Sequence, residues 1–228
     1  LQHYIEDPLL VEGKKCHIRV YAVLVRRGTQ FTVHMYNSGV MYLAKDPHDA
    51  NTTDPMVCLS GGNISKTMRM YPEVLDKLYP RKFQDVLLPQ LQQIVHDTCD
   101  AAANYLECYN ENTSCFKLIA YDVLINQQFK CFLAETNVRT IEFAYPPQAF
   151  RQMLYTDMLD LYFERATSSR WLPVLSRAVP LRAEDPKNDV ARVQEGFTNA
   201  HNAPSVLPYA LLLTLCSAVL VGCIYRRG

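Results

Sequence analysis

Residues 116–137 read FKLIAYDVLINQQFKCFLAETN, two strongly apolar runs on either side of a short polar segment. β-Branched and aromatic residues are frequent in both runs, so Phe116–Ile125 and Phe129–Thr136 are each predicted to be a β-strand. The polar residues between them, Asn126-Gln127-Gln128, are typical of a turn. This stretch therefore predicts an antiparallel hairpin with a largely buried face.

The hairpin carries acidic side chains among its apolar ones. A four-residue loop at Gln127–Lys130 would place Asp122 of the first strand directly opposite Glu135 of the second. Strand alternation places five side chains of the second strand on one face: Phe129, Cys131, Leu133, Glu135 and Asn137. Two carboxylates and an amide oxygen form a hard, oxygen-only set suited to Mg²⁺. The alternative is a strand end in solvent, but the apolar flanks favour burial beside a metal or cationic partner.

The remaining pattern predicts an α+β domain with an antiparallel sheet and flanking helices. Cys16–Val25 and Gln30–Tyr36 are predicted strands. Asp46–Asn63 is rich in Asp, Pro, Gly and Asn, which indicates a loop. Apolar residues recur at helical spacing over Pro72–Leu106, where Pro80 and Pro89 predict at least one break, and Pro147–Arg165 is predicted to be an amphipathic helix.

The C-terminal end has a different composition. Val206–Tyr225 contains 20 residues without a charge and is followed by Arg226-Arg227, which predicts a transmembrane helix over 206–225 rather than a buried core helix. Residues 166–205 are predicted to form a polar linker, and Arg182–Pro204 is its most polar part. The folded domain is expected to occupy residues 1–165.

The charge balance and the cysteines bear on the class of partner and on the cellular compartment. Lys and Arg number 23 and so do Asp and Glu, so the net charge gives no indication of a nucleic-acid partner. The eight cysteines include no CxxC pair, and free thiols in a reduced cytosolic domain are the expected state. Asn-x-Ser/Thr sequons point the other way, towards glycosylation outside the cytosol, at Asn51, Asn63 and Asn112.

Several segments resemble the tubulin–tyrosine ligase-like family. The hairpin is similar to the family segment that ends in Glu-x-Asn, and the start, QHYIEDPLLVEGKKCHIRVYAVLV, is similar to its Gln-Lys-Tyr-Ile, Pro-Leu-Leu and Lys-Phe-Asp-Ile-Arg stretch. MYNSGVMYLAKDP and CLSGGNISK align with Tyr-x-x-Gly-x-x-Arg and His-Leu-Thr-Asn…Lys. The resemblance covers Leu1–Arg165 in the correct order. It implies the C-terminal portion of an ATP-grasp fold, in which a nucleotide lies between two α+β subdomains and the glycine-rich lid lies upstream.

The resemblance also implies roles for individual residues. Asp122, Glu135 and Asn137 would hold Mg²⁺ against the phosphates of ATP. Lys15 and Arg19 would be the catalytic residues, contacting the nucleotide or the acceptor carboxylate, and Lys15 would also bind ATP. Residues 15, 17 and 19 alternate onto one face of their strand. The hinge that contacts adenine through its backbone would be formed by Gln2, His3, Tyr4 and Ile5.

Some positions depart from the family pattern. His17 stands where the family has aspartate, and Tyr42 stands where it has arginine. Ser60-Gly61 replaces the Thr-Asn pair, although Ser60 keeps a hydroxyl and Lys66 is retained. The metal set therefore matches the family, while the side that would receive the amino acid differs from it.

These observations predict an ATP- and Mg²⁺-dependent ligase that adds a free amino acid, Glu, Gly or Tyr, to tubulin or another protein acceptor. The alternatives are a catalytically impaired, membrane-anchored relative that binds tubulin or nucleotide, and an ATP-grasp ligase with a small-molecule or unrelated protein substrate. Because ATP and tubulin are cytosolic, the domain is expected to face the cytoplasm from a membrane anchor at 206–225. Arg226-Arg227 and the sequons favour the opposite orientation.

Overall fold

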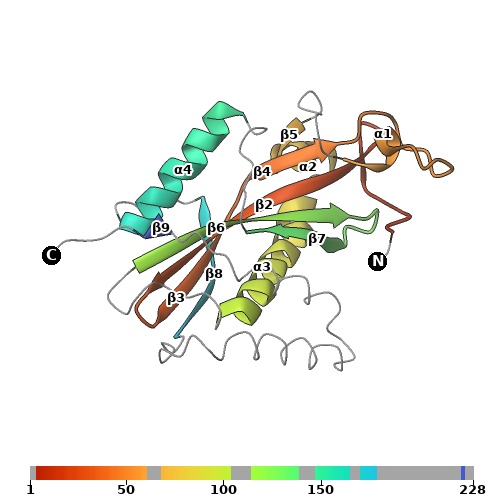
Figure 1. The fold of residues 1–228 in the computed structure, drawn as a ribbon. Helices are drawn as coiled ribbons and strands as arrows, with labels where there is room; N and C mark the ends of the chain where they lie inside the picture. The colour runs from red at the N-terminus through yellow and green to blue at the C-terminus, as the bar shows by residue number, and fades with distance from the viewer. Residues whose placement is uncertain are drawn as a thin grey trace, which may run out of the picture.

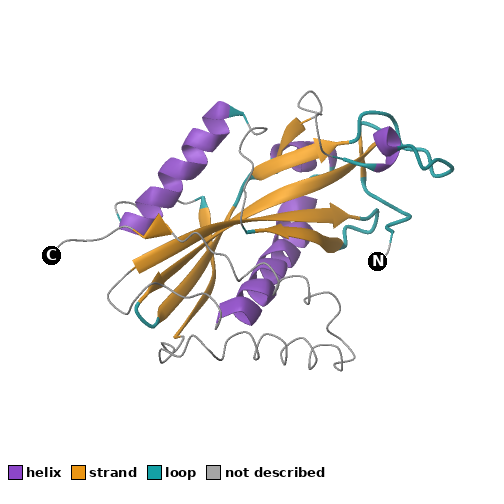
Figure 2. Ribbon diagram, in the orientation of Figure 1, coloured by secondary structure: helices purple, strands orange, loops and turns teal. Residues whose placement is uncertain are grey.

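The computed structural model describes residues 4–60, 68–103, 114–138, 147–164, 170–178 and 222–223. Within these ranges the strands form one antiparallel sheet: β1 (Leu10–Val11), β2 (Lys14–Arg27), β3 (Gln30–Tyr36), β4 (Gly39–Leu43), β5 (Met68–Tyr71), β6 (Ser114–Ile125), β7 (Cys131–Asn137), β8 (Trp171–Ala178) and β9 (Gly222–Cys223). The helices are α1 (Pro55–Cys58), α2 (Glu73–Leu78), the π-helix η2 (Phe83–Leu87), α3 (Leu88–Ala102) and α4 (Gln148–Phe163). Figure 2 shows the strands as one layer with helices on both sides.

Strand β2 organises the sheet because it is long enough to pair with two strands along one edge. Its first half pairs with β4 and its second half with β3. Strand β6 pairs with the opposite edge of β2 over His17–Arg27. Strands β5 and β8 extend the sheet beyond β4 and β3, and β7 extends it beyond β6 (Figure 1).

The alternation of β2 separates two cores. Its even-numbered residues, including Ile18, Val20 and Ala22, pack with residues of α2, η2 and α3. Its odd-numbered residues Tyr21 and Val23 pack with α4 instead. The near-continuous apolar composition of β2 follows from this arrangement, because both of its faces are covered over most of its length.

A β-bulge divides β7 between the two faces. Near the turn, Ile125 pairs with Cys131, so the loop is one residue longer than predicted. Ala134 is then the extra residue, and beyond it Asp122 pairs with Glu135 as predicted. The bulge means that the five side chains expected on one face are not all there. Cys131 and Leu133 pack against the α3-side core, whereas Asn137 contacts Asp122 on the other side.

The other predicted elements agree with the structure in type, and four segments differ. The strands over Cys16–Val25 and Gln30–Tyr36 are confirmed, as is helix α4, and the expected break occurs at Pro80 between α2 and η2. The short helix α1 lies inside the predicted loop, where Asp54 caps its first turn by accepting a hydrogen bond from the backbone N of Met56. Strand β8 lies inside the predicted linker of residues 166–205. The short strands β4 and β5 were not predicted.

The predicted membrane helix at 206–225 lies outside the described residues except for Gly222–Cys223. These two residues pair as strand β9 with Cys115 and Phe116 of β6. No helix in the part of the chain that the structure describes is long and apolar enough to cross a membrane.

The expectation of free thiols holds for part of the set. Cys16, Cys58, Cys99 and Cys131 are free. The expectation is wrong for Cys115 at the start of β6, which is disulfide-bonded. Of the sequons, Asn51 lies in the described loop before α1, and Asn63 and Asn112 lie outside the described residues.

Candidate functional site

Polar side chains gather on the α4-facing side of the sheet, at the end that α4 does not cover. Lys15, His17 and Arg19 precede Tyr21 on the same face of β2, and Tyr21 already belongs to the core beneath α4. Figure 1 shows α4 over the opposite half of β2. The cationic stripe predicted for this strand is therefore present as a shared face, although His17 does not contribute a charge to it, as described below.

Arg19 and Asp122 form the centre of this site. They are directly opposite each other on β2 and β6. The guanidinium donates from Nε to Oδ1 and from Nη2 to Oδ2 of the carboxylate, each over 2.7 Å. The two side chains are only 16% and 11% exposed. Burial alone would lower the pKa of Arg19, but the hydrogen bonds and charge of Asp122 raise it above its ordinary value, so the guanidinium is charged.

The strand β7 brings two further oxygen-bearing side chains to Asp122. Glu135 pairs with Asp122 across the ladder and is exposed, so the expectation that both acids would be buried is wrong for Glu135. Asn137 donates from Nδ2 to Oδ2 of Asp122 over 3.3 Å. The bulge at Ala134 produces this convergence, because uninterrupted alternation would keep Glu135 and Asn137 on the side of Leu133.

His17 and Tyr42, two of the departures from the family pattern, are in contact. They lie opposite each other on β2 and β4, and their rings stack with centroids 5.0 Å apart. The Nδ1 of His17 is 2.7 Å from the Oγ of Ser60. Burial lowers the pKa of His17 to about 4, against the opposing charge of Asp122, so the imidazole is neutral at physiological pH. The ring of Tyr42 also lies 5.5 Å from the Arg19 guanidinium carbon.

Lys15 is a buried cation at the edge of the same face. Its side chain lies under the ring of Tyr4, 4.2 Å from the ring centroid, and the residue is 5% exposed. No carboxylate within the described ranges forms a salt bridge with it. Burial lowers the pKa of Lys15 from its ordinary value. A buried ammonium without an anion is unfavourable, so Lys15 provides a place for an anionic ligand.

The predicted site residues are thus partly brought together. Asp122, Glu135 and Asn137 converge, Arg19 binds Asp122, and Lys15 lies four residues before Arg19 on the same face. Of the predicted adenine hinge, Tyr4 is half-exposed above Lys15 and Ile5 is buried. Gln2 and His3 lie outside the described residues, as do Gly61 and Lys66.

The oxygen set fits a divalent cation of the magnesium type. A carboxylate has about four lone-pair positions; Arg19 and Asn137 use both on Oδ2 of Asp122, and Arg19 uses one on Oδ1, so Oδ1 keeps one for a metal. Because Asn137 donates through Nδ2, its carbonyl oxygen remains as a ligand. The exposed carboxylate of Glu135 completes a set of hard donors.

Residues with separate predicted roles are in contact as pairs. Arg19 was expected to contact nucleotide or acceptor and Asp122 to bind metal, and their mutual ion pair was not predicted. The contact of Ser60 with His17 was also missed. The strand register, which pairs position 19 with 122, is the signal that would have revealed the ion pair, and the bridge between Ala44 and Ser60 is the signal for the second contact.

Comparisons with known proteins find a matching family and several relatives of this chain. The sequence model of the tubulin-tyrosine ligase family matches residues 1–140. A probable tubulin–tyrosine ligase of Schizosaccharomyces pombe is 25% identical over 146 residues, which cover 60% of this chain and 34% of the relative. The probable tubulin polyglutamylases TTLL2 of Mus musculus and TTLL9 of Bos taurus are each 28% identical over 60% of this chain, and cover 28% and 32% of those relatives. The chain spans about a third of the length of these curated relatives.

Proposed function

Because this chain belongs to the tubulin-tyrosine ligase family, we propose that the full-length protein is an ATP- and Mg²⁺-dependent ligase that adds Glu, Gly or Tyr to a protein, with tubulin as the first candidate acceptor. The printed names of its relatives support the tubulin-modifying class. The observation that carries the proposal is the buried ammonium of Lys15, which forms no salt bridge with a carboxylate of the described residues and lies on the same face of the sheet as the oxygen donors of β6 and β7. A triphosphate with its cation satisfies both, since the phosphate is the missing anion and the donors hold the metal.

The proposed chemistry proceeds in two balanced steps. The acceptor carboxylate attacks the γ-phosphorus of ATP, which forms an acyl phosphate and releases ADP. The amine of the incoming amino acid then attacks the acyl carbon, which forms an amide and releases phosphate and a proton. Mg²⁺ held by Asp122, Glu135 and Asn137 would neutralise charge on the phosphate oxygens. Lys15 would bind the phosphates, and Arg19 would fix the Asp122 carboxylate through its bidentate ion pair.

Nucleotide binding is the first test. We expect isothermal titration of the full-length protein with Mg-ATP to show micromolar affinity that falls at least tenfold in Lys15→Met and in Glu135→Ala. Both changes leave the Arg19–Asp122 pair intact. Glu73→Ala, an exposed carboxylate in the first turn of α2, is the matched control and should bind normally. Equal affinity in all four proteins would reject this site as the nucleotide site.

A second candidate is a relative that binds nucleotide without catalysis. The stacked His17–Tyr42 pair favours it, because two uncharged rings stand where the family pattern has an acid and a base. Incubation of the full-length protein with Mg-ATP, tubulin and each labelled amino acid separates the candidates. Incorporation of any of the three supports the ligase. Micromolar ATP binding without incorporation supports the binding module.

We also propose that the 206–225 segment anchors the protein in a membrane with the domain in the cytoplasm, where ATP and tubulin are found. Pairing of Gly222–Cys223 with β6 instead favours a tail that returns to the domain, so extraction of membranes with alkaline carbonate is the deciding test. A glycosidase-sensitive mass shift would overturn the cytoplasmic orientation. So would an oxidised Cys115 in protein isolated under thiol-trapping conditions, because disulfides are rare in the cytosol.

A further inference from the structure

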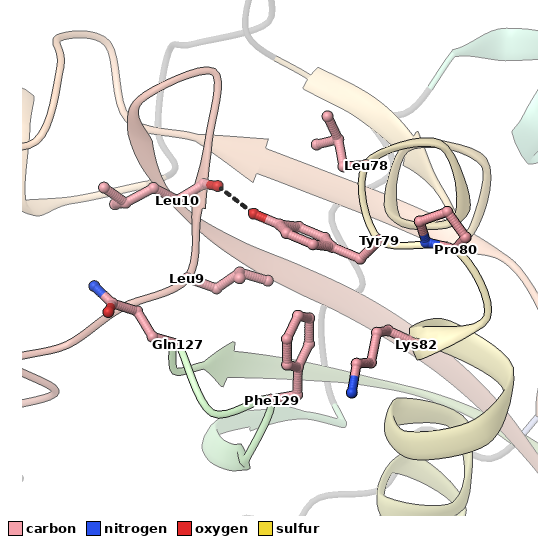
Figure 3. A pocket seen from close by; sticks show the side chains of 8 residues that line it. All are labelled: Leu9, Leu10, Leu78, Tyr79, Pro80, Lys82, Gln127 and Phe129. Carbon is pink, nitrogen blue, oxygen red and sulfur yellow. Dashed lines mark hydrogen bonds between the residues drawn. The ribbon is translucent and has the colours of Figure 1, made fainter.

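A groove of about 480 Å³ lies on the α3 side of the sheet, across the sheet from Arg19 and Asp122. Figure 3 shows its mostly apolar lining, which is formed by Leu9, Leu10, Leu78, Tyr79, Pro80, Lys82, Gln127 and Phe129. These described residues include no thiol, carboxylate or imidazole, and they do not indicate which ligand the groove would hold. A more reactive group lies on the other side of the sheet, where the thiol of Cys58 is close to Lys15.

Cys58 is the last residue of α1, and the chain around it runs along the start of β2. Helix α1 contacts β2, and the residue after Cys58 has an extended backbone. Ser60 then bridges to Ala44 and places its hydroxyl 2.7 Å from Nδ1 of His17. Residues 58 and 60 are two apart in an extended segment, as are residues 15 and 17 in β2, so the contact of Ser60 with His17 brings Cys58 to Lys15.

Two groups that stabilise a negative charge lie next to the Cys58 sulfur. The first is the buried ammonium of Lys15: burial lowers its pKa, and the charge of a Cys58 thiolate acts in the opposite direction. The second is the hydroxyl of Tyr4, whose pKa is raised by burial, by the charge of Cys58 and by a hydrogen bond between the two side chains. Because Nζ of Lys15 is 4.2 Å from the centroid of the Tyr4 ring, the three side chains form one cluster.

Cys58 differs from the other free thiols that the structure describes. Cys16 and Cys99 are each 1% exposed, and burial raises the pKa of both thiols to about 12. Burial also raises the pKa of Cys131 to about 12. These three thiols stay protonated and unreactive, because the thiolate is the nucleophile. Cys58 is partly exposed and, among these four, is the thiol that has an ammonium beside it.

In the reduced protein Cys58 is a thiol that leaves Lys15 without an anion. Its Sγ donates to the carbonyl of Thr52 over 3.2 Å, and a carbonyl oxygen favours the neutral thiol over the thiolate. When the proton leaves, the Lys15 ammonium and the Tyr4 hydroxyl stabilise the charge on sulfur. The same two groups would stabilise an oxygen anion formed on that sulfur.

We propose that Cys58 is a site of reversible oxidation by hydrogen peroxide, and that the oxidised side chain takes the place of an ATP phosphate at Lys15. The thiolate attacks one oxygen of the peroxide, so that an S–O bond forms and the O–O bond breaks. Sulfur gives up two electrons to the peroxide, and the departing hydroxide joins the thiol proton to form water. The resulting sulfenic acid is a stronger acid than the thiol, and its anion pairs with Lys15. A small thiol in excess restores Cys58 and releases water and its own disulfide. The effect on ATP rests on the proposed function, whereas the oxidation itself does not.

The oxidation is tested without nucleotide, on the full-length protein, by adding hydrogen peroxide and dimedone and mapping the labelled cysteines by mass spectrometry. Cys58 should be labelled at least about tenfold faster than Cys16, Cys99 and Cys131. Lys15→Met should slow its labelling about tenfold, and Lys15→Arg should restore most of the rate by restoring the charge.

Two further variants make this test specific. Tyr4→Phe, at a half-exposed position where folding is preserved, should slow labelling of Cys58 about threefold through loss of the hydroxyl. Lys14→Met is the matched control, because the Lys14 ammonium donates to the carbonyl of Lys45, and it should leave the rate unchanged. Labelling of Cys58 at the same rate in wild type, Lys15→Met and Tyr4→Phe would overturn the proposal, as would a rate no higher than that of the buried thiols.

The consequence for nucleotide is tested by isothermal titration with Mg-ATP before and after peroxide treatment. Oxidation should weaken binding at least about tenfold, and dithiothreitol should restore it. Cys58→Ser should bind with the same affinity before and after peroxide, and an equal loss in this variant would overturn the proposal by assigning the effect to another residue. Equal affinity of oxidised and reduced wild type would overturn the competition with phosphate and leave the proposed function standing. If the reduced protein does not bind Mg-ATP, the proposed function fails, and the labelling rates still decide whether Cys58 is the oxidation site.

Discussion

Replacing Asp122 with alanine is the sharpest test of how the polar site is stabilised. The change removes the bidentate partner of Arg19, whose guanidinium is only 16% exposed, and leaves a charge in a largely apolar wall. Breaking a buried ion pair from one side costs about 3–5 kcal/mol. Because the pair is not completely buried, we expect the free energy of unfolding to fall by about 3 kcal/mol in urea titrations.

The chain offers a matched control in which the same substitution breaks an exposed ion pair. Asp85 pairs with Arg81 one helical turn away, and these side chains are 52% and 84% exposed. Asp85→Ala should therefore cost less than about 0.5 kcal/mol. Comparing the two alanine variants separates loss of a buried partner from loss of a surface charge.

The double variant Arg19→Met, Asp122→Leu tests the physical reason. If the cost in Asp122→Ala comes from the uncompensated guanidinium, replacing both partners with apolar residues should recover most of the lost stability. The reasoning would be refuted if Asp122→Ala cost no more than Asp85→Ala, or if the double variant were less stable than Asp122→Ala alone.

Three further predictions concern neighbouring groups. Since burial lowers the pKa of folded His17 to about 4 and the ordinary value is 6.5, stability from the neutral imidazole is complete above pH ~6.5 and is lost as the pH falls towards 4. Urea titrations should show about 2 kcal/mol less stability at pH 5 than at pH 7, and the pH dependence should be smaller by this amount in His17→Gln. Lys15→Met removes a buried cation, so in urea titrations without nucleotide the free energy of unfolding should rise by about 1 kcal/mol. A decrease would show that Lys15 already has a partner in the protein. Gln90→Ala leaves the Phe129 carbonyl and the Cys131 N–H without their partner, which should lower the free energy of unfolding by about 1–3 kcal/mol in urea titrations. An unchanged free energy of unfolding would show that the turn does not need Gln90.

Much of the fold follows from local pattern. The apolar runs of β2, β3 and β6 and the helical spacing of α4 identify these elements with nearly their observed bounds, and the spacing over Pro72–Leu106 identifies the helical region that contains α2, η2 and α3. Strand β8 was missed for a physical reason. It contains Pro173, which cannot donate to the ladder and is tolerated here because, among the described strands, β8 pairs only with β3, and because it has a bulge opposite Val33 and His34.

The site was predictable as a set of residues but not as a set of contacts. Asp122 and Glu135 face each other as predicted, but only because two differences from the prediction cancel. The loop is one residue longer than expected, which shifts the pairing of β6 and β7 by one residue, and the extra residue Ala134 in β7 shifts it back. The pairs Arg19–Asp122 and His17–Tyr42 depend on which strands become neighbours. Strand neighbours are set by the packing of the whole domain, which no local stretch encodes.

The bulge at Ala134 also makes the site depend on chain length. One residue decides whether Glu135 and Asn137 face the oxygen cluster or the apolar core, since each step along a strand reverses the direction of a side chain. Deleting Ala134 would keep every residue assigned to the site and still turn its second half towards α3. A substitution scan of this family member would pass over Ala134 as a small, partly buried residue, whereas a deletion scan should identify it as one of the most sensitive positions in the domain.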